Sequence, residues 1–524
     1  MIKYFALALG IVLLHFNINR YLHIMQQAFY NFTDYMPTLK STKRLGLDFA
    51  EVVLAILIAV AIFVEGKLWV YIAWMMVTIF TLYYQIKNKP QAKKKFAITT
   101  RVKIIYAVIY LFLIATVVLS LIYEKYAFPA LCVMLSLYKH FAIVIVALCN
   151  MLAKPICNLF NLRYINDAKR ILKEKSDMKI VGITGSYGKT STKNIVSAIL
   201  SEAYSTVMTP KSFNTTLGVV RSIRENIRPY TEVFVCEMGA ARVGEIKEIC
   251  DIVKPDYSVI TSIGPQHLMT FKSIENVQKG KYEIVTNSKQ DSVAILNIDN
   301  DYINDGIGKY AKGRNVITYS LDNKKADYYV KNITLSDLGS RFTLVSKDEE
   351  YELETKLLGK HNIYNIVCAV AIARLMNVPK ERIIKAVKKL EPVEHRLQLK
   401  KMQNILTLDD SFNSNPEGSK AAIECLCMFK DKYKVLVTPG MIELGERTYE
   451  LNKKLGEYAA KCDYVILVGE KTTKPIQDGL EESGYKNYEI VKDVYQAFTR
   501  LSQIQLKNKN LLALIENDLT DSYS

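Results

Sequence analysis

The chain has 524 residues, of which half are hydrophobic, 69 are lysine or arginine and 52 are aspartate or glutamate. This length allows three or more domains with sizeable cores, and the hydrophobic fraction is high for a purely soluble protein. The net charge of +17 does not indicate nucleic-acid binding, because the sequence has no nucleic-acid motif and no basic stripe with interleaved aromatic residues. The nine cysteines are scattered, with only Cys425 and Cys427 close together, so neither a disulfide framework nor a zinc site is expected.

Apolar segments recur in the first 155 residues, and most are close to the roughly 20 residues that cross a bilayer. They predict a transmembrane helical region of about five spans over residues 1–155. Two alternatives remain: the first segment is short enough for a signal peptide, and Lys139 and His140 interrupt the last one, which leaves a count of four open. The segments cover about 2–18, 47–64, 68–86, 104–123 and 127–153.

The charges between these segments predict the side of the membrane that each connection occupies. The connection 87–103 carries seven basic residues, whereas the connections around Glu65-Gly66-Lys67 and Glu124-Lys125 are short and nearly neutral. Positive loops stay in the cytoplasm, where basic residues also attract anionic lipid headgroups. With the loop from Lys40 to Arg44 on the same side, five spans place the N-terminus outside and everything after about residue 154 in the cytosol. We therefore expect a multi-pass protein of the cell membrane that contacts membrane lipid.

A glycine-rich turn follows the short apolar run that ends at Val181. It reads Gly182-Ile183-Thr184-Gly185-Ser186-Tyr187-Gly188-Lys189-Thr190-Ser191 and continues into a helical stretch. Glycines in such a turn direct successive backbone N–H groups at one anion, and the helix that follows adds its positive end. Lys189 can reach the terminal phosphates of a nucleotide, and the Thr190 hydroxyl can ligate magnesium. The spacing G-x-x-G-x-x-G-K-T differs from the commonest P-loop. We expect a nucleotide site at Gly185, Ser186, Gly188, Lys189, Thr190 and Ser191, the alternative being a turn with an incidental lysine.

Beyond residue 178 short β-rich runs alternate with helical stretches, which is typical of parallel sheets covered by helices. Antiparallel strands are expected at about 312–358, before a helix that starts near Asn362, and a second α/β unit opens near 393–408. Ligands of open α/β sheets bind at the carboxyl ends of the strands, so polar residues at those ends are candidates for the site. The candidate parallel strands are 180–183, 233–238, 257–263, 293–297, 435–438 and 464–469.

Three polar residues lie at or after the ends of such strands. Glu237 closes an apolar run, His267 follows the next strand, and Lys281 comes about fourteen residues later. A carboxylate and an imidazole are both possible ligands of a divalent cation beside the phosphates. Taken singly, the three have simpler explanations: a helix cap, a loop histidine and a lysine on a solvated helix face. Next to a phosphate site they favour a metal site.

Eight blocks of sequence occur in a fixed order along residues 178–470. They are Gly182–Thr190, Cys236–Gly239, Ile263–Leu268, Lys279–Ile284, Gly359–Asn365, His395–Gln398, Asp409–Pro416 and Pro439–Glu446. Together they resemble the Mur ligase family, and most closely the branch that adds D-alanyl-D-alanine to UDP-muramyl tripeptide. The resemblance implies an α/β fold behind the membrane region, with a central P-loop ATP-binding domain over 156–392 and a C-terminal Rossmann-like domain over 393–524.

The resemblance also implies roles for individual residues. Lys189 would bind the β- and γ-phosphates of ATP, and Thr190 would bind one of two Mg²⁺ ions. Glu237 and His267 would help to hold the second ion, together with Lys281 once carbon dioxide has carbamoylated it, a change that turns a cation into an anion. Lys189, Lys281 and His267 would thus act in catalysis. The nucleotide would further contact Asn362, Asn365, Arg396 and Asp410.

The activity implied is amide-bond formation in peptidoglycan synthesis, in which an acceptor carboxylate attacks ATP to give an acyl phosphate and an amine displaces phosphate. Two features depart from the family: membrane helices replace the domain that grips the UDP-muramyl acceptor, and no Lys-Gly-Ser-Arg element occurs near Ala513 to Asp521. We expect a muramyl-peptide-type acceptor, either lipid-linked or handed over at the membrane surface, that receives D-Ala-D-Ala or another amino acid. The alternatives are a membrane-bound poly-γ-glutamate-type ligase and a membrane ATPase without ligase activity.

Overall fold

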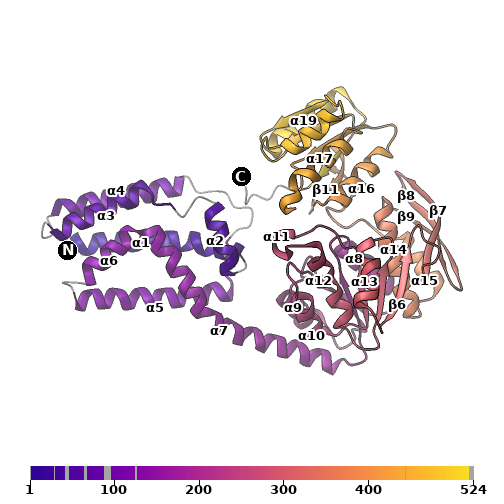
Figure 1. Cartoon of the computed structure of the whole chain (residues 1–524), viewed down its shortest axis with the longest axis horizontal. Coiled ribbons are helices and arrows are strands. Elements are labelled where there is room, and N and C mark those ends of the chain that lie inside the picture. Colours follow the sequence, from indigo (N-terminus) through magenta and orange to yellow (C-terminus); the bar gives the residue numbers. More distant parts are fainter. Residues whose placement is uncertain are drawn as a thin grey trace. The chain divides into compact units, whose positions relative to one another are not determined.

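The computed structural model of the chain describes most of its length as two compact units, which divide between Arg163 and Tyr164 (Figure 1). The basic stretch 88–95, the connections 64–67 and 124–126, and the end of the chain from Asp518 lie outside the described residues. The residues that the structure describes are 2–28, 30–41, 46–63, 68–87, 96–123, 127–402, 404–412, 414–442 and 444–517.

In the first unit, all regular secondary structure of the described residues up to Arg163 is helical. Four helices, α1, α4, α5 and α7, are long and apolar enough to cross a membrane. The expected span 47–64 corresponds to α3, which has only 15 residues, and the expected span 127–153 is divided between α6 and α7. In Figure 1, α1, α3, α4 and α5 run roughly along one direction. The helices are α1 (Ile2–Gln27), α2 (Phe32–Ser41), α3 (Phe49–Phe63), α4 (Leu68–Lys87), α5 (Thr100–Ile122), α6 (Ala127–Ser136) and α7 (Tyr138–Glu174), the last crossing the unit boundary.

The charged residues of the last expected span are paired with carboxylates around the start of α3. The Lys139 ammonium lies 3.1 Å from the Asp48 carboxylate and 3.6 Å from that of Glu51, and the His140 ring lies 3.4 Å from Glu51. The Glu51 side chain is fully buried. Charged groups among apolar helices are costly unless they face other helices, and these do.

Replacing Glu51 by alanine should destabilise this helical unit by ~3 kcal/mol, because it leaves Lys139 buried with one carboxylate fewer. It also removes the acceptor of the Lys139 and Asp48 backbone N–H groups. Both tryptophans, Trp69 and Trp74, lie on α4, so tryptophan fluorescence in detergent follows the thermal unfolding of this unit alone. The double variant Glu51→Leu/Lys139→Met, which removes both charges, should unfold at a higher temperature than Glu51→Ala. An unchanged midpoint for Glu51→Ala would show that the cluster does not hold α3 to α7.

The second unit contains a sheet of nine strands in the order β2-β3-β1-β4-β5-β6-β7-β8-β9. Strands β2 to β7 pair in parallel, and β7, β8 and β9 pair antiparallel, as expected for the segment 312–358. The strands are β1 (Lys179–Thr184), β2 (Thr206–Met208), β3 (Val233–Glu237), β4 (Tyr257–Ile260), β5 (Val293–Asn297), β6 (Asn315–Ser320), β7 (Tyr328–Ser336), β8 (Gly339–Ser346) and β9 (Glu350–Thr355).

Helices cover both faces of this sheet, so β1 and β3 are nearly continuous apolar runs. Along β1, Val181 and Ile183 enter the core shared with α8, α14 and α15, while Ile180 enters the core shared with α9, α10, α12 and α13. The helices are α8 (Lys189–Leu200), α9 (Thr216–Asn226), α10 (Glu245–Val253), α11 (Leu268–Phe271), α12 (Ile274–Thr286), α13 (Asp301–Tyr310), α14 (Lys360–Leu375) and α15 (Lys380–Lys388).

A second sheet follows, with six strands in the order β10-β11-β15-β12-β13-β14, all parallel except β10. Because β15 enters between β11 and β12, the carboxyl ends of these three strands, at Asp410, Thr438 and Glu516, lie together. The predicted α/β class with two sheets is confirmed. The elements are β10 (Gln398–Met402), β11 (Ile405–Asp410), α16 (Pro416–Cys427), β12 (Tyr433–Thr438), η1 (Gly445–Arg447), α17 (Thr448–Ala459), β13 (Tyr464–Val468), α18 (Lys474–Glu482), β14 (Tyr488–Val491), α19 (Val494–Lys507) and β15 (Leu511–Glu516).

Candidate active site

The turn between β1 and α8 has the geometry that phosphate binding requires. Gly185 and Gly188 have positive φ angles of 152° and 79°. A β-carbon at Gly185 would lie 2.0 Å from the Thr261 hydroxyl oxygen, so only glycine fits there. The Ser186 hydroxyl donates to the Gly264 carbonyl oxygen and accepts from the Gly264 N–H, both at 3.1 Å. The loop is therefore held from the end of the neighbouring strand β4.

Lys189, followed by Thr190 and Ser191, opens α8, whose positive end faces this loop. The Lys189 ammonium donates to two carbonyl oxygens of the loop, at 2.7 and 3.0 Å. Burial lowers the pKa of Lys189 to about 8, against the opposing effect of the Glu237 carboxylate and with a smaller contribution from Arg396. The predicted phosphate-binding lysine is thus close to charged groups from two other parts of the chain.

Glu237 ends β3 beside the first turn of α8, because β1 and β3 pair with Ile183 opposite Glu237. Its Oε1 accepts from the Thr190 hydroxyl at 3.2 Å and from Asn214 Nδ2 at 3.0 Å. Its Oε2 lies 3.0 Å from the ammonium of Lys193, and both side chains are 1% exposed. The Glu237 carboxylate and the Thr190 hydroxyl therefore lie together beside the phosphate loop, at the carboxyl ends of β1 and β3.

His267 and Lys281 come from the segment that follows β4. His267 precedes α11 with φ of 51°. Lys281, on α12, is 1% exposed, and its ammonium donates to the Ala240 carbonyl oxygen at 3.3 Å. Burial holds the pKa of Lys281 well below its ordinary value, and the charge of Lys189 lowers it further. Among the residues that the structure describes, no carboxylate forms an ion pair with Lys281, although Glu245 acts on it at longer range.

These side chains fit a magnesium site that is completed by other oxygen donors. In the described part of the chain no three His, Cys, Asp or Glu side chains form a ready-made metal site. Thr190 Oγ1 and Glu237 Oε1, 3.2 Å apart, are hard oxygen donors of the kind that Mg²⁺ prefers. Phosphate oxygens and a carbamate on Lys281 would supply further donors of the same kind. The arrangement therefore suits a metal bound together with a nucleotide.

Asn362 and Asn365 lie on α14, packed against the helix that follows the phosphate loop. Asn365 Oδ1 accepts from the Thr192 hydroxyl at 2.9 Å, and a β-carbon at Gly188 would lie 3.2 Å from it. Asn362 Nδ2 donates to the Leu358 carbonyl oxygen at 2.9 Å. Both amides thus have partners within the protein, and their contact with a nucleotide stays a prediction.

Arg396 and Asp410 belong to the C-terminal region that contains the six-stranded sheet. Even so, Arg396 lies in the electrostatic environment of the phosphate loop. Burial lowers its pKa, while the carboxylates of Asp410 and Glu237 oppose that shift. Its guanidinium lies 4.6 Å from the centroid of the Phe412 ring. Asp410 accepts from the Leu397 N–H at 3.1 Å, and burial raises its pKa to about 6 against the effect of Arg396.

Sequence reasoning gave no role to Lys193, His361 and Glu516, which are polar groups near the predicted residues; Lys193 and Glu516 are buried and His361 is half-buried. Lys193 follows Lys189 by four residues on the same helix face, a spacing that signals it. Burial and the charge of Arg396 lower the pKa of His361 to about 4, and its Nδ1 has no hydrogen-bond partner among the described residues. Glu516 ends β15, where no motif marks it.

Glu516 should make the stability of the C-terminal sheet depend on pH. The hydroxyls of Ser414, Ser419 and Thr438 donate to its carboxylate, and burial raises its pKa from 4.5 to about 7. Because the folded state holds the proton more tightly than the unfolded state, the free energy of unfolding falls as the pH rises from 4.5 to about 7.

The variant Glu516→Gln cannot ionise. It should be more stable than the natural protein by ~2 kcal/mol at alkaline pH and no more stable at acidic pH, below both pKa values. Urea midpoints followed by circular dichroism at a series of pH values measure this difference. The same pH dependence in both proteins would contradict the assignment.

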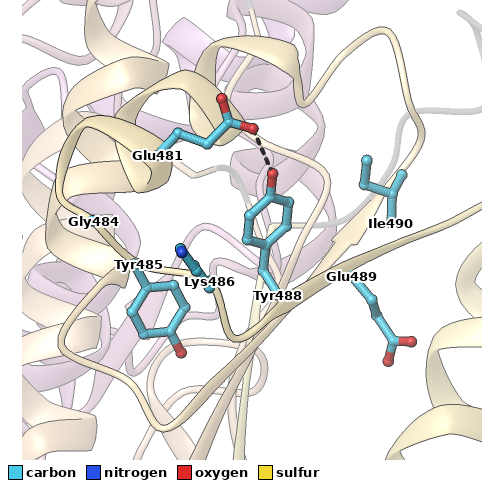
Figure 2. Close-up of a pocket in the computed structure, with 7 residues that line it drawn as sticks. All are labelled: Glu481, Gly484, Tyr485, Lys486, Tyr488, Glu489 and Ile490. Carbon is cyan, nitrogen blue, oxygen red and sulfur yellow. Dashed lines mark hydrogen bonds between the residues drawn. The ribbon is translucent and has the colours of Figure 1, made fainter.

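The hollow drawn in Figure 2 is formed by other residues, on α18, β14 and their connection. Tyr485, Lys486 and Tyr488 are among its lining side chains, and the Tyr488 hydroxyl donates to Glu481 Oε1 at 2.7 Å. None of the predicted site residues lines it. We therefore assign the chemistry to the phosphate loop and its neighbours.

Two family models match the chain. The Mur ligase middle domain matches residues 183–373, and the Mur ligase glutamate ligase domain matches residues 395–514. The UDP-N-acetylmuramoyl-tripeptide--D-alanyl-D-alanine ligase of Bacillus subtilis (strain 168) is 32% identical, over 63% of this chain and 72% of that protein. The enzyme of the same name from Escherichia coli (strain K12) is 31% identical, over 57% of this chain and 67% of that protein.

Solved structures agree with these matches. The crystal structure of MurF from Acinetobacter baumannii superposes with a TM-score of 0.63 at 25% identity, over 69% of this chain and 78% of that one. The MurF ligase from Thermotoga maritima in complex with ADP superposes with a TM-score of 0.61 at 25% identity, over 69% of this chain and 80% of that one. The chain belongs to the Mur ligase family and is an ATP-dependent ligase that forms C–N bonds.

Proposed function

We propose that the chain activates the carboxylate of a muramyl-peptide-type acceptor as an acyl phosphate and couples it to D-Ala-D-Ala or another amino acid, in cell-wall synthesis. The observation that carries the proposal is the meeting of Lys189, Thr190 and Glu237 at the phosphate loop, beside a buried Lys281 that has no carboxylate partner among the described residues. The names of the relatives, which specify D-alanyl-D-alanine and a muramoyl tripeptide, supply the substrates.

The side chains have distinct tasks in this reaction. Lys189 and the first N–H groups of α8 bind the β- and γ-phosphates and stabilise charge on the transferred phosphoryl group. An acceptor carboxylate oxygen bonds to the γ-phosphorus as the bond to ADP breaks. The incoming amine then bonds to the acyl carbon, loses a proton and expels phosphate. Thr190 holds one Mg²⁺, and Glu237 and His267 help to hold a second. When bound, the Mg²⁺ ions would neutralise negative charge on the phosphates. Contacts of Arg396 and Asp410 with the nucleotide belong to the same proposal.

The proposal includes carbamoylation of Lys281. Its lowered pKa favours the neutral amine, whose nitrogen bonds to the carbon of carbon dioxide and releases a proton, leaving a carbamate anion. An ammonium group at this place would repel a metal ion, whereas a carbamate offers it an oxygen ligand. Lys281 thus becomes a third side chain, with Glu237 and His267, that serves the second Mg²⁺.

The first unit would anchor the ligase to the cell membrane. If α3 crosses the bilayer as well as the four longer helices, five crossings put the basic connections 40–44 and 87–103 on one side. That side is the cytoplasm by the positive-inside rule, and the chain beyond α7 follows it there, where ATP is available. We infer that the acceptor is lipid-linked or handed over at the membrane surface, because helices precede the ATP-binding domain where the family has an acceptor domain.

Mass spectrometry of reaction products tests this function. The purified protein in detergent receives ATP, Mg²⁺, D-Ala-D-Ala or a panel of D-amino acids, and either soluble UDP-muramyl tripeptide or its lipid-linked counterpart. We expect a product with the mass of acceptor plus amine minus water, formed faster from the lipid-linked acceptor. Equal rates would contradict the lipid-linked acceptor. Glutamate polymers would favour the poly-γ-glutamate alternative, and ADP without any amide would favour a membrane ATPase.

A further inference from the structure

A buried lysine that the mechanism above does not use lies against the carboxylate proposed to hold the metal. The side chains of Lys193 and Glu237 are each 1% exposed, and the Lys193 ammonium lies 3.0 Å from Glu237 Oε2. The same ammonium donates to the Lys211 carbonyl oxygen at 2.5 Å. Lys193 follows Lys189 by four residues and Thr190 by three, so its side chain is a neighbour of each of them on the surface of α8.

We propose that Lys193 is a positioning residue. Its ammonium neutralises the Glu237 carboxylate and so keeps the second divalent cation from binding before the nucleotide. The inference rests on the proposed function, because it takes Glu237 as a metal ligand.

The contacts of Glu237 set which carboxylate oxygen faces the phosphate loop. The Thr190 hydroxyl at 3.2 Å and Asn214 Nδ2 at 3.0 Å donate to Oε1, while the Lys193 ammonium lies beside Oε2 as a charge partner that forms no hydrogen bond with it. Lys193 also fixes the chain after β2 through the carbonyl of Lys211. A cation that binds Glu237 therefore approaches Oε1, on the side of Thr190 and the phosphates.

The charges around Glu237 oppose a metal ion until phosphates arrive. Its carboxylate is paired with Lys193 and interacts at longer range with Lys189 and Arg396. A divalent cation would bring two more positive charges to a partly buried place that already holds three cations, where repulsion is strong. The phosphates of a nucleotide reverse this balance. The second cation is therefore expected to enter with the nucleotide or after it.

A purely structural role for Lys193 makes a different prediction. A buried ion pair often contributes no more stability than an apolar pair of similar volume, but removing one partner is strongly destabilising. On that view Lys193→Met would be less stable and would bind metal in the same order as the natural protein. The two views are separated by metal binding without nucleotide, which needs no ligation.

Electron paramagnetic resonance of Mn²⁺ with the full chain in detergent makes this measurement, without nucleotide and with a non-hydrolysable ATP analogue. The natural protein should bind Mn²⁺ weakly until the analogue is added. Without nucleotide, Lys193→Met should bind Mn²⁺ at least about tenfold more tightly than the natural protein. The variant loses the repulsion between the ammonium and the metal ion, and at this short range that repulsion exceeds the free energy of a tenfold change in affinity. Lys193→Arg keeps the charge and should keep the natural order of binding.

Two further variants make the result specific. Lys247→Met removes an exposed lysine whose ammonium lies 2.6 Å from Asp251, and it should leave Mn²⁺ binding unchanged. Lys193→Met/Glu237→Gln removes both buried charges and should lose the binding gained by Lys193→Met.

The proposal is wrong if folded Lys193→Met binds Mn²⁺ no more tightly than the natural protein. It is also wrong, whatever the variants do, if the natural protein binds Mn²⁺ equally tightly with and without nucleotide. Failure of ligation with muramyl peptides, with this binding order retained, would overturn the proposed substrates alone.

Discussion

Replacing Lys189 by alanine should lower the rate of acceptor-dependent ADP formation by about 10²–10³-fold, because preorganised charge on the transferred phosphoryl group is lost. Lys189 is the first residue of α8, and its ammonium is held over the loop by two loop carbonyl oxygens at 2.7 and 3.0 Å. An alanine fits a helix and leaves no buried charge, so the fold should survive. Release of ADP, measured with acceptor and amine present, reports the loss.

Lys179→Ala is the matched control for this change. Lys179 stands at the opposite end of β1, is 54% exposed, and forms a distant ion pair of 3.8 Å with Asp256. Its loss should leave turnover within about twofold, as for other exposed ion pairs. Near-normal ligation by Lys189→Ala would refute the phosphate-binding role of Lys189, whatever the control shows.

Replacing Lys281 by arginine should lower ligation by about 10²-fold or more, because arginine stays charged and cannot form a carbamate. The natural protein with ¹³C-bicarbonate should show a carbamate carbon signal in NMR spectra, which Lys281→Arg lacks. Since the carbamate forms from the neutral amine with release of a proton, the signal should strengthen as the pH rises and disappear on acidification. Burial lowers the pKa of Lys281, so this occurs at a lower pH than for an exposed lysine.

Lys279→Arg is the control, since Lys279 is exposed on the same helix, α12. It should keep both the signal and the activity. A Lys281→Arg protein as active as this control would exclude a catalytic carbamate, and so would a natural protein that gives no carbamate signal while it is active.

The phosphate loop could be predicted from sequence because its chemistry constrains local residues. At Gly185 only glycine fits against Thr261, and the run Gly188-Lys189-Thr190 must begin a helix. The six expected parallel strands and the antiparallel segment were also predictable, since buried strands are short apolar runs between turns. These features are encoded within a few residues of one another.

Features that depend on distant contacts could not be predicted in this way. The hydrogen bond between Thr192 and Asn365 joins residues 173 apart in the sequence, and the contact of Asn362 and Asn365 with a nucleotide stays a prediction. The role of Lys193 requires knowing that the end of β3 lies beside α8, which only strand order fixes.

The N-terminal helical unit shows the same limit. That Asp48 and Glu51, at the start of α3, pair with Lys139 of α7 depends on the packing of helices far apart in the sequence.

Isotope transfer tests whether the acceptor carboxylate is activated on ATP. The acceptor is prepared with ¹⁸O in the carboxylate that becomes the amide, and the phosphate released during ligation is analysed by mass spectrometry. An acyl phosphate passes one carboxylate oxygen to phosphate, so we predict one ¹⁸O in the phosphate for each amide formed. Unlabelled phosphate released alongside amide product would exclude an acyl-phosphate intermediate.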